Sequence, residues 1–355
     1  MSGLAPLGRW ALGLAVGAVA GFLLGLVQAP LPWLIGPLLA MAALRLAAAP
    51  ADPVPGARQL GQVIVGVAIG LYFTAEVLGE LASHTAIMLV TSLATLLLGA
   101  ATAVVLSRLG RIDLKTAYFC SMPAGAAEMA VLGDRHGAQA APIALSQSLR
   151  IAVIVLTVPQ AVNAFGSAGG LVYAPALRDV LWLRLLPMLA AAAAVGWLFS
   201  RARVNNAWFL GSLATGIVIA ALALPLSAVP GWLVSAAQVL LGLALGARFD
   251  RAFLIAAPRF TLAALLSALF MVMLCALMGW LVAQAMAMTP AAAVLATAPG
   301  SIGEMAVTAR ALGVAVPMVT AFQLVRIVMV LLLAGPFFAL CRRLYAPVPR
   351  VGLGD

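Results

Sequence analysis

The chain of 355 residues is too apolar to be a soluble domain. Hydrophobic residues make up 65% of it, charged residues only 8%, and the mean hydropathy is +1.15. This is the composition of a membrane protein with many spans. The net charge of +10 comes from basic residues scattered through predicted loops, a pattern that argues against a nucleic-acid-binding surface.

Apolar segments follow one another at short intervals along the chain. In the first half we expect helical spans near residues 9–27, 32–48, 59–77, 85–106 and 139–163, with a Pro/Gly-broken stretch at 114–134 before the last. The second half repeats this order at 180–200, 207–226, 233–247, 260–287 and 314–340, with a broken stretch at 290–309. We interpret the first run as a span and not a signal peptide, because nothing downstream resembles a secreted domain.

The two halves are copies of each other, offset by 176 residues. Cys120–Val131 and Gln147–Arg150 in the first half correspond to Ala296–Val307 and Gln323–Arg326 in the second. Gly66, Ala68 and Gly70 match Gly242, Ala244 and Gly246 in the same register. The duplication predicts a first membrane repeat at 1–165, a connecting loop at 166–178, a second repeat at 179–345 and a cytoplasmic tail at 346–355.

Positive charges predict how each repeat is oriented, because cytoplasmic loops carry an excess of Lys and Arg. If the N-terminus is cytoplasmic and both broken stretches are re-entrant hairpins, fifteen of the 20 Lys and Arg residues lie inside and three outside. Each repeat then makes five crossings, so the second enters the membrane inverted. The predicted fold is therefore an all-α membrane protein with two inverted repeats of five transmembrane helices, each with a re-entrant hairpin. A broken helix that crosses the membrane is the alternative for each stretch.

The two broken stretches carry the predicted solute site. Irregular backbone at membrane depth is tolerated only where protein or a watery cavity satisfies its polar groups, and the half-helix after each break points its positive N-terminal end inward. A kinked but continuous helix is the structural alternative. The predicted substrate-binding residues are Ser121, Pro123, Gly125, Gln147, Arg150, Pro299, Gly300, Ser301, Gly303, Gln323 and Arg326.

Four ionisable residues lie within apolar sequence at matching places. Glu128, Glu304, Arg150 and Arg326 would together cost roughly 10–14 kcal/mol at helix centres if unpaired. We expect each arginine, with the glutamine three residues before it, to face the hairpin tip and to recognise a carboxylate. The glutamates are expected to take up the coupling ion, H⁺ or Na⁺. Alternatively, each glutamate pairs only with the arginine of its own repeat.

These paired Pro-Gly…Glu-Met-Ala and Gln-x-x-Arg motifs, and their duplication, resemble the AbrB-type duplicated membrane proteins. That family is often labelled a transcriptional regulator or an ammonia monooxygenase. The resemblance implies kinship with the cation/proton antiporter and anion symporter folds, which have inverted five-helix repeats. Neither label fits the residues: no DNA-binding module is evident, and His84 and His136 cannot build a multi-histidine metal site.

The predicted function is that of an ion-coupled secondary transporter, a symporter for a small anionic solute that works by alternating access with elevator-like movement. The alternative is a membrane sensor that binds a ligand in the same place and regulates gene expression through a partner. We expect no enzyme activity, no catalytic residue, and no metal or other cofactor apart from the coupling ion. The expected partners are the lipid bilayer, the solute and a second copy of the chain, with no nucleic acid. The expected location is a bacterial inner membrane, with both termini cytoplasmic.

Overall fold

The computed structural model describes residues 6–165, 173–177, 179–249, 251–286 and 288–341, and within these ranges all the regular secondary structure is α-helix, without strands. The first half contains α1 (Pro6–Leu26), α2 (Pro32–Leu46), α3 (Ala57–Gly70), α4 (Ala75–Ser83), α5 (Thr85–Gly110), α6 (Leu114–Ser121), α7 (Ala126–Arg135) and α8 (Ala140–Phe165). The second half contains α9 (Trp182–Arg201), α10 (Ala207–Ala221), α11 (Gly231–Gly246), α12 (Arg251–Ala256), α13 (Pro258–Met286), α14 (Pro290–Thr297), α15 (Ile302–Ala311) and α16 (Val316–Cys341).

Six of these helices in the described chain are long and apolar enough to cross a membrane, namely α1, α5, α8, α9, α13 and α16. Each coincides with a span predicted from the sequence. The chain is therefore a membrane protein with several spans, as its composition indicates.

The other four predicted spans form shorter helices than expected. α2, α10 and α11 contain 15, 15 and 16 residues, or about 22–24 Å at 1.5 Å per residue, against a hydrocarbon core of about 30 Å. The predicted span at 59–77 is bent, because α3 ends at Gly70 and α4 leaves it at 85°. Pro50, Pro225 and Pro230 interrupt the flanking apolar runs, and proline does not continue a helix. By length alone the described chain has six spans, or seven if the bent pair counts as one.

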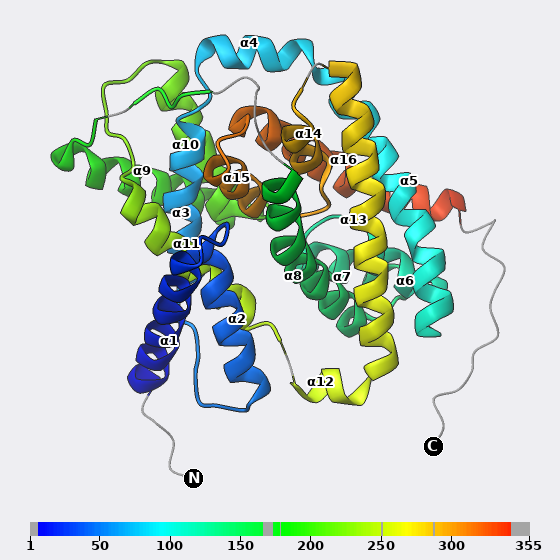
Figure 1. Ribbon diagram of the computed structural model, residues 1–355. Helices are drawn as coiled ribbons and strands as arrows, with labels where there is room; N and C mark the ends of the chain where they lie inside the picture. The colour runs from blue at the N-terminus through cyan, green and yellow to red at the C-terminus, as the bar shows by residue number, and fades with distance from the viewer. Residues whose placement is uncertain (1–5, 166–172, 178, 250, 287, 342–355) are drawn as a thin grey trace.

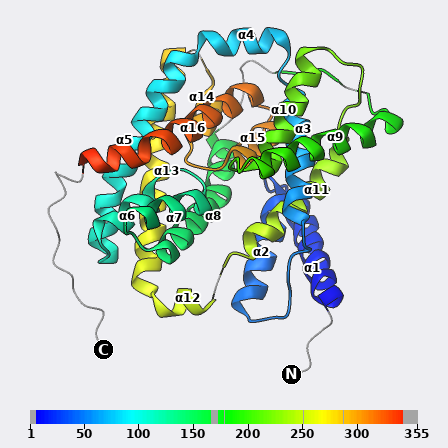
Figure 2. The same cartoon turned by 180° about the vertical axis from the view of Figure 1, so that it is seen from behind.

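The helices form two groups (Figure 1). α1–α3 pack with α9–α11, and we call this set the first bundle; α5–α8 pack with α13–α16, and we call this set the second bundle. Figure 2 shows the same division from behind, with α4 and α12 at opposite ends of the molecule. Each bundle thus draws helices from both sequence repeats, and α15 of the second bundle packs against α3 of the first.

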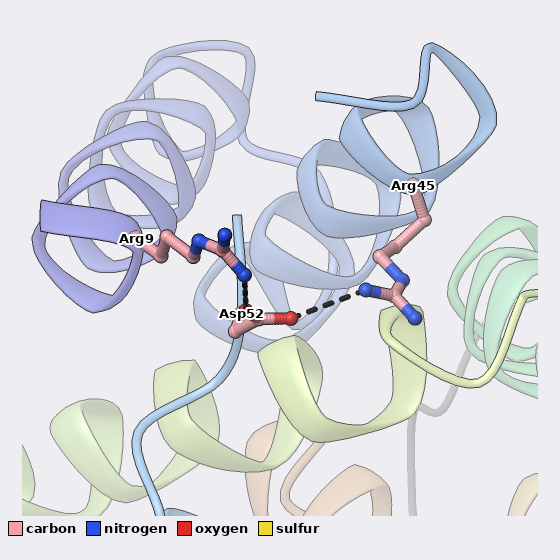
Figure 3. Close-up of polar contacts among 3 residues, drawn as sticks. All are labelled: Arg9, Arg45 and Asp52. Atoms are coloured by element: carbon pink, nitrogen blue, oxygen red, sulfur yellow. Dashed lines mark hydrogen bonds and ion pairs between the residues drawn. The ribbon is translucent and has the colours of Figure 1, made fainter. Parts of the chain in front are cut away.

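An ion-pair cluster ties together the two ends of the first helical hairpin (Figure 3). The Asp52 carboxylate lies 3.6 Å from Nη1 of Arg9, at the start of α1, and 3.1 Å from Nη1 of Arg45, at the end of α2. These two arginines therefore share one end of the first bundle, as the charge-based orientation requires.

Glycines allow the crossed helix pairs of the first bundle to approach closely. α3 packs against α10 and α11 packs against α2, and these two pairs are related by the sequence repeat. A Cβ atom at Gly70 would lie 2.5 Å from the carbonyl oxygen of Leu213 and 2.7 Å from Cα of Gly216. A Cβ atom at the matching Gly246 would overlap the carbonyl oxygen of Leu38. The matched glycines of the two repeats are therefore helix contacts, of the kind small residues make in membranes.

Gly70→Ala is expected to lower the stability of the protein by about 1–3 kcal/mol, because the added methyl group meets rigid backbone. Gly79→Ala on α4 is the matched control, because nothing lies within 4 Å of the place that its methyl group would take. Replacing glycine by alanine inside a helix is otherwise favourable by up to about 1 kcal/mol. Thermal unfolding in detergent should place Gly70→Ala below the wild type and Gly79→Ala at or above it. Equal midpoints for the two variants would contradict the close packing.

Candidate functional site

The first broken stretch is a hairpin in which α7 folds back along α6. The chain leaves helical geometry between Met122 and Gly125. The backbone N–H of Gln139, just beyond α7, donates to Oγ1 of Thr116, near the start of α6, at 3.1 Å. The rings of Phe119 and His136 lie 5.4 Å apart. The two open ends of this stretch are therefore adjacent.

The second broken stretch has the same sequence of elements. α14 ends at Thr297, the chain is irregular at Ala298–Ser301, and α15 begins at Ile302. Thr289 caps the start of α14 with its hydroxyl oxygen, just as Asp113 caps α6 with its carboxylate.

One glutamine binds the last carbonyls of the half-helix before each break. Nε2 of Gln147 donates to the carbonyl oxygens of Phe119, Cys120 and Met122 at 3.0, 3.2 and 2.9 Å. Nε2 of Gln323 donates to those of Leu295, Ala296 and Ala298 at 2.8, 3.3 and 3.0 Å. Each acceptor in the second set lies 176 positions after its counterpart. The glutamines satisfy carbonyls that a helix end leaves without partners.

The two arginines continue this pattern into the break itself. Nη1 and Nη2 of Arg150 donate to the carbonyl oxygens of Met122 and Ala124 at 2.9 and 3.2 Å. The same atoms of Arg326 donate to the matching carbonyls of Ala298 and Gly300. Both side chains are buried, and Nε of each lacks a partner. The cations thus stabilise the negative end of α6 and of α14 through charge-assisted hydrogen bonds.

The predicted face of each Gln-x-x-Arg motif does turn toward its hairpin tip, but what it contacts there is backbone. Within the described residues, the ion pairs are those of Asp52 with Arg9 and Arg45. Neither Arg150 nor Arg326 therefore pairs with the glutamate of its own repeat. Their partners are carbonyl oxygens, which sequence reasoning did not consider.

Both glutamates occupy the third position of the half-helix after the break. A Cβ atom at Gly125 would collide with the Glu128 carboxylate, which therefore lies against the backbone at the start of α7. In the second repeat Ser301 stands in place of Gly125, and its Oγ accepts from the N–H of Glu304 at 3.5 Å. The backbone of Ser301 in turn hydrogen-bonds the Glu304 carboxylate, so the two residues cap α15 reciprocally. Oε2 of Glu304 is buried and has no partner.

The remaining predicted site residues line the two breaks. Ser121, Pro123, Pro299 and Gly300 are buried, and Oγ of Ser121 has no hydrogen-bond partner. Gly303 faces the ring of Phe209 on α10, so the second hairpin reaches the first bundle.

Two arginines that sequence reasoning assigned only to loops also belong to this region. Arg248 follows α11 and is half-buried, and it interacts electrostatically with Glu304, Glu128 and Arg58. Burial and the like charge of Arg58 lower the pKa of Arg248, while the two carboxylates act in the opposite direction. Glu304 also interacts with Arg58, in the first turn of α3. In the sequence, the feature that could have indicated a role for these two arginines was their position at the ends of short apolar helices.

Within the described residues, no three His, Cys, Asp or Glu side chains gather as metal ligands would. What the region presents is a set of ionisable groups around two helix breaks: two carboxylates at the hairpin tips, and two cations contributed by the first bundle.

The chain matches one family over nearly its whole length. The family model described as "Transition state regulatory protein AbrB" matches residues 7–342. "Uncharacterized protein YhjN" of Bacillus subtilis (strain 168) is 28% identical, over 94% of this chain and 93% of its own length. "Putative regulator AbrB" of Escherichia coli (strain K12) is 29% identical, over 90% of this chain and 92% of its own.

Proposed function

The chain belongs to the AbrB family, and from that premise we propose that it is an ion-coupled secondary transporter of a small, anionic solute in a bacterial inner membrane. The observation that carries the proposal is the pair of broken helices. In each, a buried Gln-x-x-Arg motif donates hydrogen bonds to the backbone carbonyls of the break. Discontinuous helices at matching places in two repeats are the arrangement that transporters use to bind solutes in mid-membrane.

The positions of the hairpins support an inverted arrangement of the repeats. In Figure 1, α5 descends from α4 at the top toward α6 and α7, whereas α13 rises from α12 at the bottom toward α14 and α15. The hairpins thus join their bundle from opposite ends, and α5 packs against α13. We infer that both stretches are re-entrant, that each repeat crosses five times, and that both termini are cytoplasmic.

The division into two bundles supports alternating access by elevator-like movement. The second bundle holds both hairpins, and the first bundle would be the fixed scaffold. α1 and α9 are the least buried of the six long apolar helices, so we place the contact of a homodimer there.

The chemistry of the breaks supports an anionic solute and a separate ion site. The N-terminal ends of α7 and α15 attract negative charge, while the terminal nitrogens of Arg150 and Arg326 are already bonded to carbonyls. Among the described residues, neither Glu128 nor Glu304 has a basic side chain within 4 Å of its carboxylate. They remain the candidates for binding H⁺ or Na⁺.

The proposal is tested by solute uptake. The purified protein is reconstituted into liposomes and incubated with a defined mixture of small carboxylates and amino acids, with and without Na⁺ or pH gradients. Mass spectrometry of the liposome contents should find a solute that accumulates only with the protein and only with a gradient. Protein-free liposomes are the control, and absence of any gradient-driven accumulation contradicts transport.

The name of the Escherichia coli relative favours a second candidate, a membrane sensor. A sensor binds a solute without moving it. Thermal stabilisation by a component of the same mixture, without uptake, is the result expected of a sensor, because a ligand that binds the native state raises its apparent stability.

A further inference from the structure

The two hairpins pack differently against the first bundle, although their sequences match. α15 of the second hairpin lies along α3. A Cβ atom at Gly303, at the start of α15, would lie 3.5 Å from Cε2 of Phe209 on α10. The matching helices of the other copy are α7 and α11, and among the described residues they share no contact of comparable extent. The second hairpin is therefore docked on the first bundle, and the first hairpin is not.

The apolar cores divide in the same way. One core contains buried residues of α15 together with those of α2, α3, α10 and α11. A separate core contains the buried residues of α6 and α7 with those of α5, α8, α13 and α16. Within the described chain, none of the buried members of this second core comes from α1–α3 or α9–α11. The first hairpin thus packs within the second bundle alone.

Two valines at the same position of the two copies show the difference most clearly. Val131 and Val307 each end a Glu-Met-Ala-Val sequence, 176 residues apart. Val131 is 55% exposed, whereas Val307 is 2% exposed. α7 therefore leaves open an apolar face that α15 has covered. In lipid an open apolar face costs little, because lipid tails are as apolar as the side chains, so the docked and undocked arrangements can lie close in free energy.

The first bundle offers the first hairpin a surface that matches the one occupied by α15. α11 repeats the sequence of α3, with Gln-Val at 238–239 in the place of Gln-Val at 62–63. Leu34 on α2 has the place that Phe209 has on α10, one residue after a tryptophan. At α11 and Leu34, α7 would find an environment equivalent to that of α15 at α3 and Phe209.

We propose that the protein alternates between two conformations that exchange the roles of the hairpins. In the described one α15 is docked on α3; in the other α7 is docked on α11 and α15 is released. The inference rests on the proposed function in taking the repeats to be inverted and the second bundle to move. In inverted repeats this exchange turns the solute site from one face of the membrane to the other. Two arrangements with equivalent contacts differ little in free energy, so a bound solute or ion can shift their populations.

Cross-linking in proteoliposomes tests the exchange with two matched pairs of cysteines. The background carries Cys120→Ala, Cys275→Ala and Cys341→Ala, which removes all three native thiols. Gly303→Cys with Phe209→Cys reports the described conformation, because the two positions are in contact there. Ala127→Cys with Leu34→Cys occupies the matching positions of the other copy and reports the second conformation. A short bifunctional methanethiosulfonate reagent should bridge both pairs, and the single-cysteine variants, which cannot be bridged, are the controls.

Each bridge should lock one conformation, so solute uptake should be lost after cross-linking of either pair and should return after reduction. If the Ala127/Leu34 pair is not bridged under conditions that bridge the Gly303/Phe209 pair, the exchange is wrong. Uptake without bridging of the Ala127/Leu34 pair would leave transport in place and remove the exchange. Bridging of both pairs in a protein that takes up no solute would do the reverse.

A pair of exposed positions provides a test that does not place cysteines in the core. Val131→Cys on α7 and Ala236→Cys on α11 carry spin labels, and both positions are exposed. Pulsed electron paramagnetic resonance should find two distances between the labels, the shorter belonging to the conformation with α7 on α11. The control is Val131→Cys with Leu277→Cys, an exposed position on α13 of the same bundle, which should give one distance. A single distance for the Val131/Ala236 pair overturns the proposal.

Discussion

Arg326→Met should destabilise the second hairpin more than any other single change considered for this protein. Its two terminal nitrogens satisfy the carbonyls of Ala298 and Gly300. The Gly300 carbonyl is left without a partner, which costs about 1–3 kcal/mol. The Ala298 carbonyl keeps its bond from Gln323 but loses a charge-assisted bond worth about 1.5–3 kcal/mol, so the total loss is about 2.5–6 kcal/mol. Arg326→Lys should lose less, because one ammonium group can still bond one of the carbonyls.

The measurement is thermal unfolding and monodispersity in detergent, with Arg251→Met as the matched control on an exposed arginine. If Arg326 served only to bind solute, Arg326→Met would unfold at the wild-type temperature and lose solute binding alone. That outcome would restore the sequence-based prediction, in which Arg326 recognises the carboxylate of the solute.

Glu304→Gln is expected to leave the protein folded and to remove the dependence of uptake on the coupling ion. A glutamine at this position can still complete the cap with Ser301, but it has no titrating charge. One pH unit across the membrane, coupled to one proton, supports about ten-fold accumulation, because 1.36 kcal/mol corresponds to a factor of ten. In Glu304→Gln the accumulation ratio should fall to about one.

Glu128→Gln is the companion variant, and uptake at zero gradient is the reference for both. Should both variants misfold and recover when the matching arginine is replaced by methionine, the glutamates are structural ion-pair partners. The hydrogen bonds of Arg150 and Arg326 to carbonyls make that recovery unexpected.

The sequence alone was sufficient for the six long helices and for the two Pro/Gly breaks that precede α7 and α15. Runs of about 20 apolar residues have few alternatives to helix in lipid, so α1, α5, α8, α9, α13 and α16 appear where they were predicted. The 176-residue repeat predicted matched elements, and the hydrogen bonds of Gln147 and Gln323 reproduce it residue for residue. The three-residue spacing of Gln and Arg also predicted a shared face toward the hairpin tip.

Tertiary structure decided what those side chains bind. Every residue has a backbone carbonyl, so an acceptor such as that of Ala298 leaves no trace in residue types. Sequence reasoning sought charged partners for Arg150 and Arg326, and the structure supplies carbonyls at helix ends. The bend after Gly70 and the electrostatic interaction of Arg248 with Glu128 and Glu304 were likewise not predictable from spacing. Both depend on packing between segments far apart in the chain, whereas periodicity and composition report only local structure.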